Sequence, residues 1–189
     1  NAEDGISALL TAESALNEIA QLAIRLRELG IQRDNAALLS DTMEEAAIDK
    51  EAEGINDTIG NIISETKFNE ISLLSTSAAN TLSIGSSVDG TNNNSITTTN
   101  EFVDVSSNTD ADGAENSADT LLEDVALSLG NIAAGISSLK ARQSVSYASA
   151  ANLEAAASRI LDTDFAKETA NLTKASVLNQ SAMAMVAQA

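Results

Sequence analysis

The sequence contains no cysteine, histidine, proline or tryptophan, and only 2% of its residues are aromatic. Without cysteine the chain forms no disulfide and no thiolate metal site, and without histidine it lacks the usual general base and the commonest transition-metal ligand. We therefore predict that it is not an enzyme, with no catalytic residue, no metal ligand and no cofactor. The absence of proline favours long uninterrupted helices, because a proline inside a helix destabilises it by about 3 kcal/mol.

Basic residues are also scarce: there are 10, against 28 acidic residues, which gives a net charge of −18. Nucleic acid and anionic membrane surfaces repel such a chain, so neither is predicted as a partner. No apolar run reaches the roughly 20 residues that a membrane span requires. Hydrophobic residues nevertheless make up 43% of the chain, and with so few aromatics the core is expected to consist of Ala, Leu and Ile.

A seven-residue hydrophobic repeat runs from Leu122 to Ile160, where apolar or small residues recur at alternating spacings of three and four. This pattern is typical of a coiled coil, in which one helix face stays against a partner helix. At about 1.5 Å per residue, the helix is on the order of 60 Å long. We predict that it begins near Ser117 and that an apolar face continues beyond Asp164 to the end of the chain.

Two further helices are predicted before this one, the first over Ala2 to about Arg33 and the second from Ser40 or Asp41 to about Glu65. Gly54 and Gly60 weaken the second helix by roughly 1 kcal/mol each relative to alanine. The apolar positions at helical spacing define a predicted helix-packing seam, which includes Leu16, Ile19, Leu26, Ile55, Ile59, Leu129, Ile132, Ile136, Leu153 and Ile160.

Between these helices lies a segment rich in Ser, Thr and Asn. The alternation at 82–84, the turn dipeptide Asp89-Gly90 and the β-prone run at 96–99 predict a short hairpin, followed by an acidic loop over 108–116. The predicted fold is therefore mainly α: an elongated, rod-like bundle of two N-terminal helices and one very long C-terminal helix, with a small β-hairpin.

Five short motifs, taken together, resemble bacterial flagellin, the subunit of the flagellar filament. They are NAEDGISALLTAESAL at 1–16, RLRELGIQ at 25–32, TKFN at 66–69, LSIG at 82–85 and SRILDTDFAKETA at 158–170. The resemblance implies a secreted, extracellular structural protein that assembles into a motility filament with other flagellin subunits. It also implies an export chaperone and a cap protein as partners.

The resemblance implies a division of the chain into four segments. Residues 1–72 are the N-terminal helices of a helical shell domain, 73–116 the hairpin and acidic loop, 117–171 the long C-terminal helix of the same domain, and 172–189 the start of an inner-tube helix. Because Asn1 matches a point well inside the family sequence, we expect a core fragment that lacks the N-terminal and most of the C-terminal inner-tube helices. Such a fragment is expected to remain monomeric.

Flagellins are also ligands of the Toll-like receptor that senses them. Carried over by motif, the residues that contact this receptor or a neighbouring subunit are Arg25, Leu29, Gln32 and Glu51. Gly30 stands where the family usually has alanine, and the stretch after Gln32 is longer, which affects the placement of Glu51. Filament packing is the favoured main role of these residues.

Two alternative functions are retained. One is the hook–filament junction protein, which resembles flagellin at both ends, although the run at 158–170 and the tail rich in Ala, Gln and Met favour flagellin. The other is a flagellin-like, carbohydrate-binding surface protein, which would need aromatic side chains to stack on sugars. Tyr147 and three phenylalanines offer little of this kind.

Polar or small residues interrupt the middle of the long seam, at Gln143, Ser146 and Ala150. We predict that this weaker part of the seam passes the junction of the two N-terminal helices, near 33–40.

Overall fold

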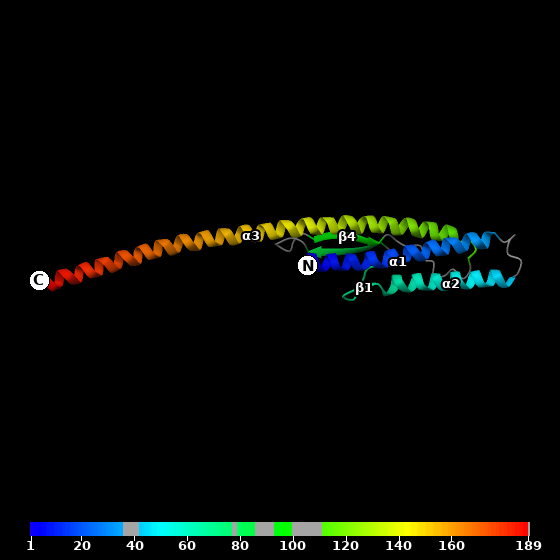
Figure 1. The fold of residues 1–189 in the computed structure, drawn as a ribbon, viewed down its shortest axis with the longest axis horizontal. Coiled ribbons are helices and arrows are strands. Elements are labelled where there is room, and N and C mark those ends of the chain that lie inside the picture. The colour runs from blue at the N-terminus through cyan, green and yellow to red at the C-terminus, as the bar shows by residue number, and fades with distance from the viewer. Residues whose placement is uncertain (36–41, 77–78, 86–92, 100–110, 189) are drawn as a thin grey trace. The chain divides into compact units, whose positions relative to one another are not determined.

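The fold is that of a computed structural model, which describes residues 1–35, 42–76, 79–85, 93–99 and 111–188. Its elements, in chain order, are α1 (Ala2–Asp34), α2 (Thr42–Glu65), β1 (Lys67–Phe68), β2 (Ile71–Ser72), β3 (Asn80–Gly85), β4 (Asn93–Thr99) and α3 (Ala114–Gln188), as shown in Figure 1. This confirms a mainly α fold with two N-terminal helices, one very long C-terminal helix and a small β-hairpin.

The chain divides into two compact units, Asn1–Arg142 and Gln143–Ala189, called here the first unit and the second unit. The boundary falls within α3. It does not follow the four segments expected from the sequence, and the domain roles given to those segments stay a prediction.

The helix boundaries lie close to those predicted. α1 ends at Asp34. It has Glu3 and Asp4 in its first turn and Arg33 in its last turn, and charges in this arrangement interact favourably with the helix dipole and stabilise the helix. α3 begins at Ala114, three residues before the predicted start, directly after Gly113 at φ 70°, a backbone conformation that glycine adopts without strain. The backbone remains helical across 162–164, where the sequence pattern shifts.

In the first unit, α1 runs between α2 and the first part of α3 and is antiparallel to both (Figure 1). The buried face of α1 follows the predicted stripe at alternating spacings of three and four. The seam residues Leu16, Ile19 and Leu26 are fully buried there. Burial of this face is the main favourable contribution to the stability of the bundle.

On α2 and α3 the buried line is displaced by one residue from the predicted seam. Ile59 and Ile132 are buried as predicted, but Ile55, Leu129 and Ile136 are only half-buried. The centre of the α3 interface passes instead through the following residues: Leu121, Val125, Ser128, Ile132, Gly135 and Leu139. Ser128 and Gly135 were missed because a hydroxyl and a missing side chain do not register in a hydrophobic pattern.

Strands β3 and β4 form the predicted antiparallel hairpin, with Leu82 opposite Ile96 and Ile84 opposite Asn94. This hairpin packs closely against two helices at positions where glycine leaves room for its isoleucine side chains. A Cβ atom on Gly5 of α1 would lie 2.4 Å from Ile84 Cδ1, and one on Gly135 of α3 would lie 2.5 Å from Ile96 Cγ2. The predicted turn at Asp89-Gly90 and the first three residues of the predicted acidic loop, 108–110, lie outside the described residues, and the last three, 114–116, belong to α3 instead.

A second, smaller hairpin was not predicted. β1 and β2 are two residues each, and Asn69 and Glu70 between them both have positive φ, at 50° and 66°. Beyond β2, Leu73 donates its backbone N–H to the carbonyl of Thr66 at 3.0 Å, and Leu73 and Leu74 are buried in the core. This hairpin therefore turns the chain so that two leucines after it enter the bundle.

The end of α1 lies against the start of α3. A Cβ atom on Gly30 would be 2.5 Å from the backbone nitrogen of Glu115, and the surrounding core cluster is largely alanine, with Leu26, Leu29, Ala52, Ala111, Ala114 and Ala118. The end of α1 thus meets the first turn of α3 within the first unit. Residues 143–150 belong to the second unit, and their expected passage by the end of α1 stays a prediction.

Candidate interaction surfaces

Ion pairs connect α1 to the two helices beside it. Arg25 Nη2 lies 2.6 Å from Glu51 Oε1 of α2, and Arg27 Nε lies 2.6 Å from Asp119 Oδ1 of α3. Arg25 also pairs with Glu28 within α1. These groups are about half exposed, and such pairs typically contribute no more than about 1 kcal/mol each. They specify which faces meet more than they stabilise the bundle.

Two cations at this surface, Arg25 and Lys50, have raised pKa values. The pKa of Arg25 is raised above its usual value, chiefly by the hydrogen bond to Glu51 and then by that to Glu28. The pKa of Lys50 is raised above 10.5, mainly by its hydrogen bond to Glu53. A raised pKa favours the folded state below the unfolded pKa, so this contribution is lost only as the pH rises through the folded value.

Of the predicted contact residues, Arg25, Gln32 and Glu51 lie on the surface, with Arg25 and Glu51 joined to each other. Leu29 does not: its exposed fraction is 1%, because it packs in the alanine-rich cluster. For all four residues, contact with a receptor or a neighbouring subunit stays a prediction.

Asp49 joins three segments, and sequence reasoning missed it. Its Oδ1 accepts hydrogen bonds from Arg33 Nε of α1 at 3.2 Å and from the backbone N–H of Ala111, before α3, at 3.1 Å. Arg33 Nη1 also lies 3.4 Å from Glu45 Oε2. No local pattern in the sequence indicates this connection, because Asp49 and Ala111 are 62 residues apart.

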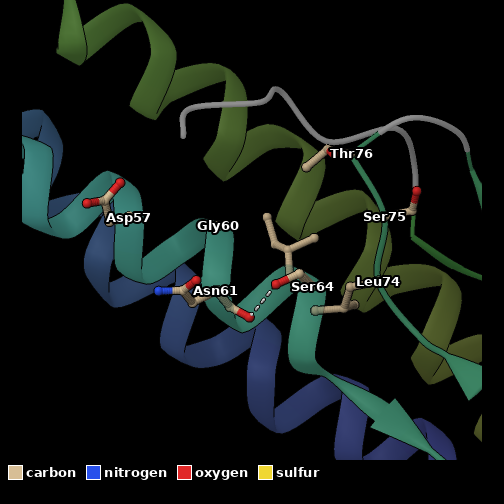
Figure 2. A pocket seen from close by; sticks show the side chains of 8 residues that line it. Asp57, Gly60, Asn61, Ser64, Leu74, Ser75 and Thr76 are labelled. Carbon is tan, nitrogen blue, oxygen red and sulfur yellow. Dashed lines mark hydrogen bonds between the residues drawn. The ribbon is translucent and has the colours of Figure 1, made fainter. Parts of the chain in front are cut away.

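A polar groove with a volume of about 660 Å³ lies beside α2. Figure 2 shows Asp57, Asn61 and Ser64 on α2, with Ser75 and Thr76 on the segment after β2. Ser64 Oγ donates to the backbone carbonyl of Asn61 at 3.1 Å. The lining residues include hydroxyls and one carboxylate but no Lys, Arg or His that would activate a hydroxyl, so the groove gives no support for a catalytic site.

The second unit exposes large apolar side chains along α3. Leu153 and Ile160, both predicted on the packing seam, are 70% and 65% exposed. As helix-packing positions these two residues stay a prediction, and the last buried residue of α3 in the first unit is Leu139. Further exposed apolar residues of this unit are Leu161, Phe165, Leu172, Val177, Leu178, Met183, Met185 and Val186.

Metal clusters and membrane spans are both absent from the described part of the chain. In these residues no three Asp or Glu side chains are grouped so that they could hold a metal ion. None of the helices described is both long and apolar enough to cross a membrane.

Comparison with known proteins accounts for both ends of the chain. The family model of the bacterial flagellin N-terminal helical region matches residues 1–79, and that of the C-terminal helical region matches 114–189. A flagellin of Halalkalibacterium halodurans is 32% identical over 200 residues, which cover 100% of this chain and 72% of that relative. The chain belongs to the bacterial flagellin family. Hairpin β3–β4 lies between the two matched regions of this flagellin.

Other similar proteins are also flagellins. A flagellin of Bacillus subtilis is 30% identical, with 100% of this chain and 75% of the relative covered. A protein named secreted flagellin C, from Campylobacter jejuni, is 27% identical, with coverages of 99% and 69%. The crystal structure of Bacillus cereus flagellin superposes with a TM-score of 0.59 over 74% of this chain and 84% of the other, at 22% identity, and supports the fold. The names of these relatives favour flagellin over the hook–filament junction protein.

Proposed function

We propose that this flagellin is a structural subunit of an extracellular flagellar filament and joins other subunits through the second unit. The exposed apolar residues of that unit carry the proposal. The first unit buries its apolar face within the chain, whereas the second unit leaves Leu153, Ile160 and Leu172 more than half exposed. Contiguous exposed apolar surface of this kind marks an interaction site, and a helix of a second subunit covers it best.

The test is filament formation by the intact gene product in a strain without its own flagellin. We expect the wild-type gene to give filaments visible by electron microscopy. Leu153→Asp should lower filament number at least tenfold, because it places a charge on the contact surface. Asn152→Asp adds the same charge in the same turn of α3 and should assemble normally. Wild-type cells without filaments, or equal loss with both variants, would reject the proposal.

Export chaperone and cap protein are proposed as further partners by family resemblance alone. The carbohydrate-binding alternative gains no support from the groove beside α2, because no aromatic residue lines it.

We also propose that the surface with Arg25, Gln32 and Glu51 binds the flagellin-sensing Toll-like receptor. In reporter cells, wild-type protein should signal, and Arg25→Ala should raise the half-maximal concentration about tenfold, roughly the effect of losing 1.4 kcal/mol of binding. Arg27→Ala removes a neighbouring arginine that pairs with Asp119 instead and should change the response less than twofold. An inactive wild type would remove this proposal and leave the filament proposal intact.

A further inference from the structure

The dipeptide Asp-Gly occurs three times in the sequence, at 4–5, 89–90 and 112–113. This dipeptide is prone to a spontaneous rearrangement, because glycine has no side chain to hinder attack by its backbone nitrogen on the preceding carboxyl group. The attack also requires a glycine nitrogen that is not held in a hydrogen bond. The structure describes the first and the third of these sites, and they differ in how that nitrogen is held.

The first site lies inside α1 and is held by its surroundings. Gly5 is buried, and its N–H donates to the backbone carbonyl of Asn1 at 2.9 Å. A Cβ atom on Gly5 would lie 2.4 Å from Ile84 Cδ1, so the backbone here packs closely against hairpin β3–β4. Attack of the Gly5 nitrogen on Asp4 would break a bond of the first helical turn and move backbone that is tightly packed.

The third site lies just before α3 and is held much less. Gly113 precedes the first residue of the helix, so its N–H takes no part in the hydrogen bonds within the helix. Asp112 is exposed, and among the described residues its carboxylate has no hydrogen bond or ion pair and the N–H of Gly113 has no backbone acceptor. Nothing lies within 4 Å of the position that a Cβ atom on Gly113 would take. Attack at this site therefore breaks none of the bonds described.

We propose that Asp112 converts spontaneously to isoaspartate and that the product holds α3 less firmly against α1 and α2. The Gly113 nitrogen bonds to Asp112 Cγ, while the proton of that nitrogen and the carboxyl hydroxyl leave as water, which gives a five-membered imide. Water then opens the imide. Cleavage between the nitrogen and Cγ restores aspartate, whereas cleavage between the nitrogen and the backbone carbonyl carbon gives isoaspartate. One water is released and one is consumed, and no other reactant enters.

Isoaspartate adds one carbon to the main chain between two contacts that position α3. On one side, Ala111 donates its backbone N–H to Asp49 Oδ1 of α2 at 3.1 Å. On the other side, the backbone nitrogen of Glu115 would lie 2.5 Å from a Cβ atom on Gly30 of α1. A longer path between these two points changes the geometry of at least one contact. The reaction needs no second subunit and is independent of the proposed function.

The first experiment compares the two described sites in the folded and the unfolded chain. The protein is kept at 37 °C and pH 7.4 for four weeks in oxygen-18 water, with or without guanidinium chloride. Peptide mapping by mass spectrometry then locates isoaspartate by its shifted retention and its incorporated heavy oxygen. In the folded chain, isoaspartate at Asp112 should exceed that at Asp4 at least tenfold, whereas in the unfolded chain the two sites should agree within about threefold.

Two results of this experiment would overturn the inference. One is an equal amount of isoaspartate at the two sites of the folded chain. The other is an amount at Asp112 that is tenfold lower in the folded than in the unfolded chain, which would mean that the fold protects this site as well.

The second experiment measures the effect on α3. The modified fraction of aged protein, separated by chromatography, should unfold about 3 °C below the unmodified fraction. Asp112→Glu keeps the charge but cannot form the five-membered imide, so its thermal midpoint should stay within about 1 °C after the same ageing. Asp4→Glu is the matched control and should age like the wild type. A modified fraction that unfolds together with the unmodified one, or equal ageing of the two variants, would contradict the proposal.

Discussion

Leu16→Ala is expected to lower the free energy of unfolding of this flagellin by about 2–5 kcal/mol, the largest effect of any substitution considered. Leu16 is fully buried in the main core of the first unit, where α1 meets its neighbours. Truncation removes apolar contact and leaves a cavity that the packed helices around it only partly fill. Urea denaturation followed by circular dichroism measures the change.

Leu153→Ala is the matched control, because it makes the same chemical change at a seam position that is 70% exposed. Its effect on unfolding of the isolated chain should stay within about 0.5 kcal/mol. If Leu16→Ala lowered stability by less than about 1 kcal/mol, or if the two variants were equally destabilised, the placement of the core in the first unit would be wrong.

Gly30→Ala and Gly54→Ala should change stability in opposite directions. Alanine favours a helix over glycine by up to about 1 kcal/mol, so a site with free space gains stability. Nothing lies within 4 Å of the position that a Cβ atom on Gly54 would take, and we expect Gly54→Ala to stabilise the chain by about 0.5–1 kcal/mol.

At Gly30 the added methyl group would meet backbone. Its Cβ atom would lie 2.5 Å from the nitrogen of Glu115 and 2.9 Å from Oε2 of the same residue. The first turn of α3 would have to move, and overpacking of this kind typically costs about 1–3 kcal/mol, which outweighs the gain in helix propensity. Thermal denaturation of both variants compares them directly. Stabilisation by Gly30→Ala would show that α1 and α3 do not approach closely there.

Periodicity in the sequence was enough to predict the helices and most of the buried face, but it left the partners of that face undetermined. The same repeat continues through Ile132, which is buried, and Leu153, which is exposed. A seven-residue repeat indicates that a helix face packs against a partner. Whether that partner lies in the same chain depends on where the other helices end, and no residue of α3 itself encodes this.

The parts of the interaction surfaces that were missed depend on contacts between distant segments. Asp49 binds Arg33 and the backbone of Ala111, yet its own sequence context reads as a solvated acidic helix face. Leu29 was assigned to an interface by its motif, whereas it is buried in a cluster with Ala52, Ala111, Ala114 and Ala118. Both outcomes follow from the close approach of α1 and α3 at Gly30, which a hydrophobic pattern does not reveal.

The hydrogen bond from Ala111 to Asp49 has a consequence for the order of folding. It closes a loop of 62 residues. Hairpin β3–β4 packs against Gly5 and against Gly135, so its contacts involve positions near both ends of the first unit. Contacts between such distant positions form slowly, because the entropy of loop closure is lost before they contribute. As the chain is made from its N-terminus, α1 packs first against α2 and then against β3, and its contacts with α3 form only after residues 114–139 emerge. The first unit therefore completes its folding late, once α3 is available.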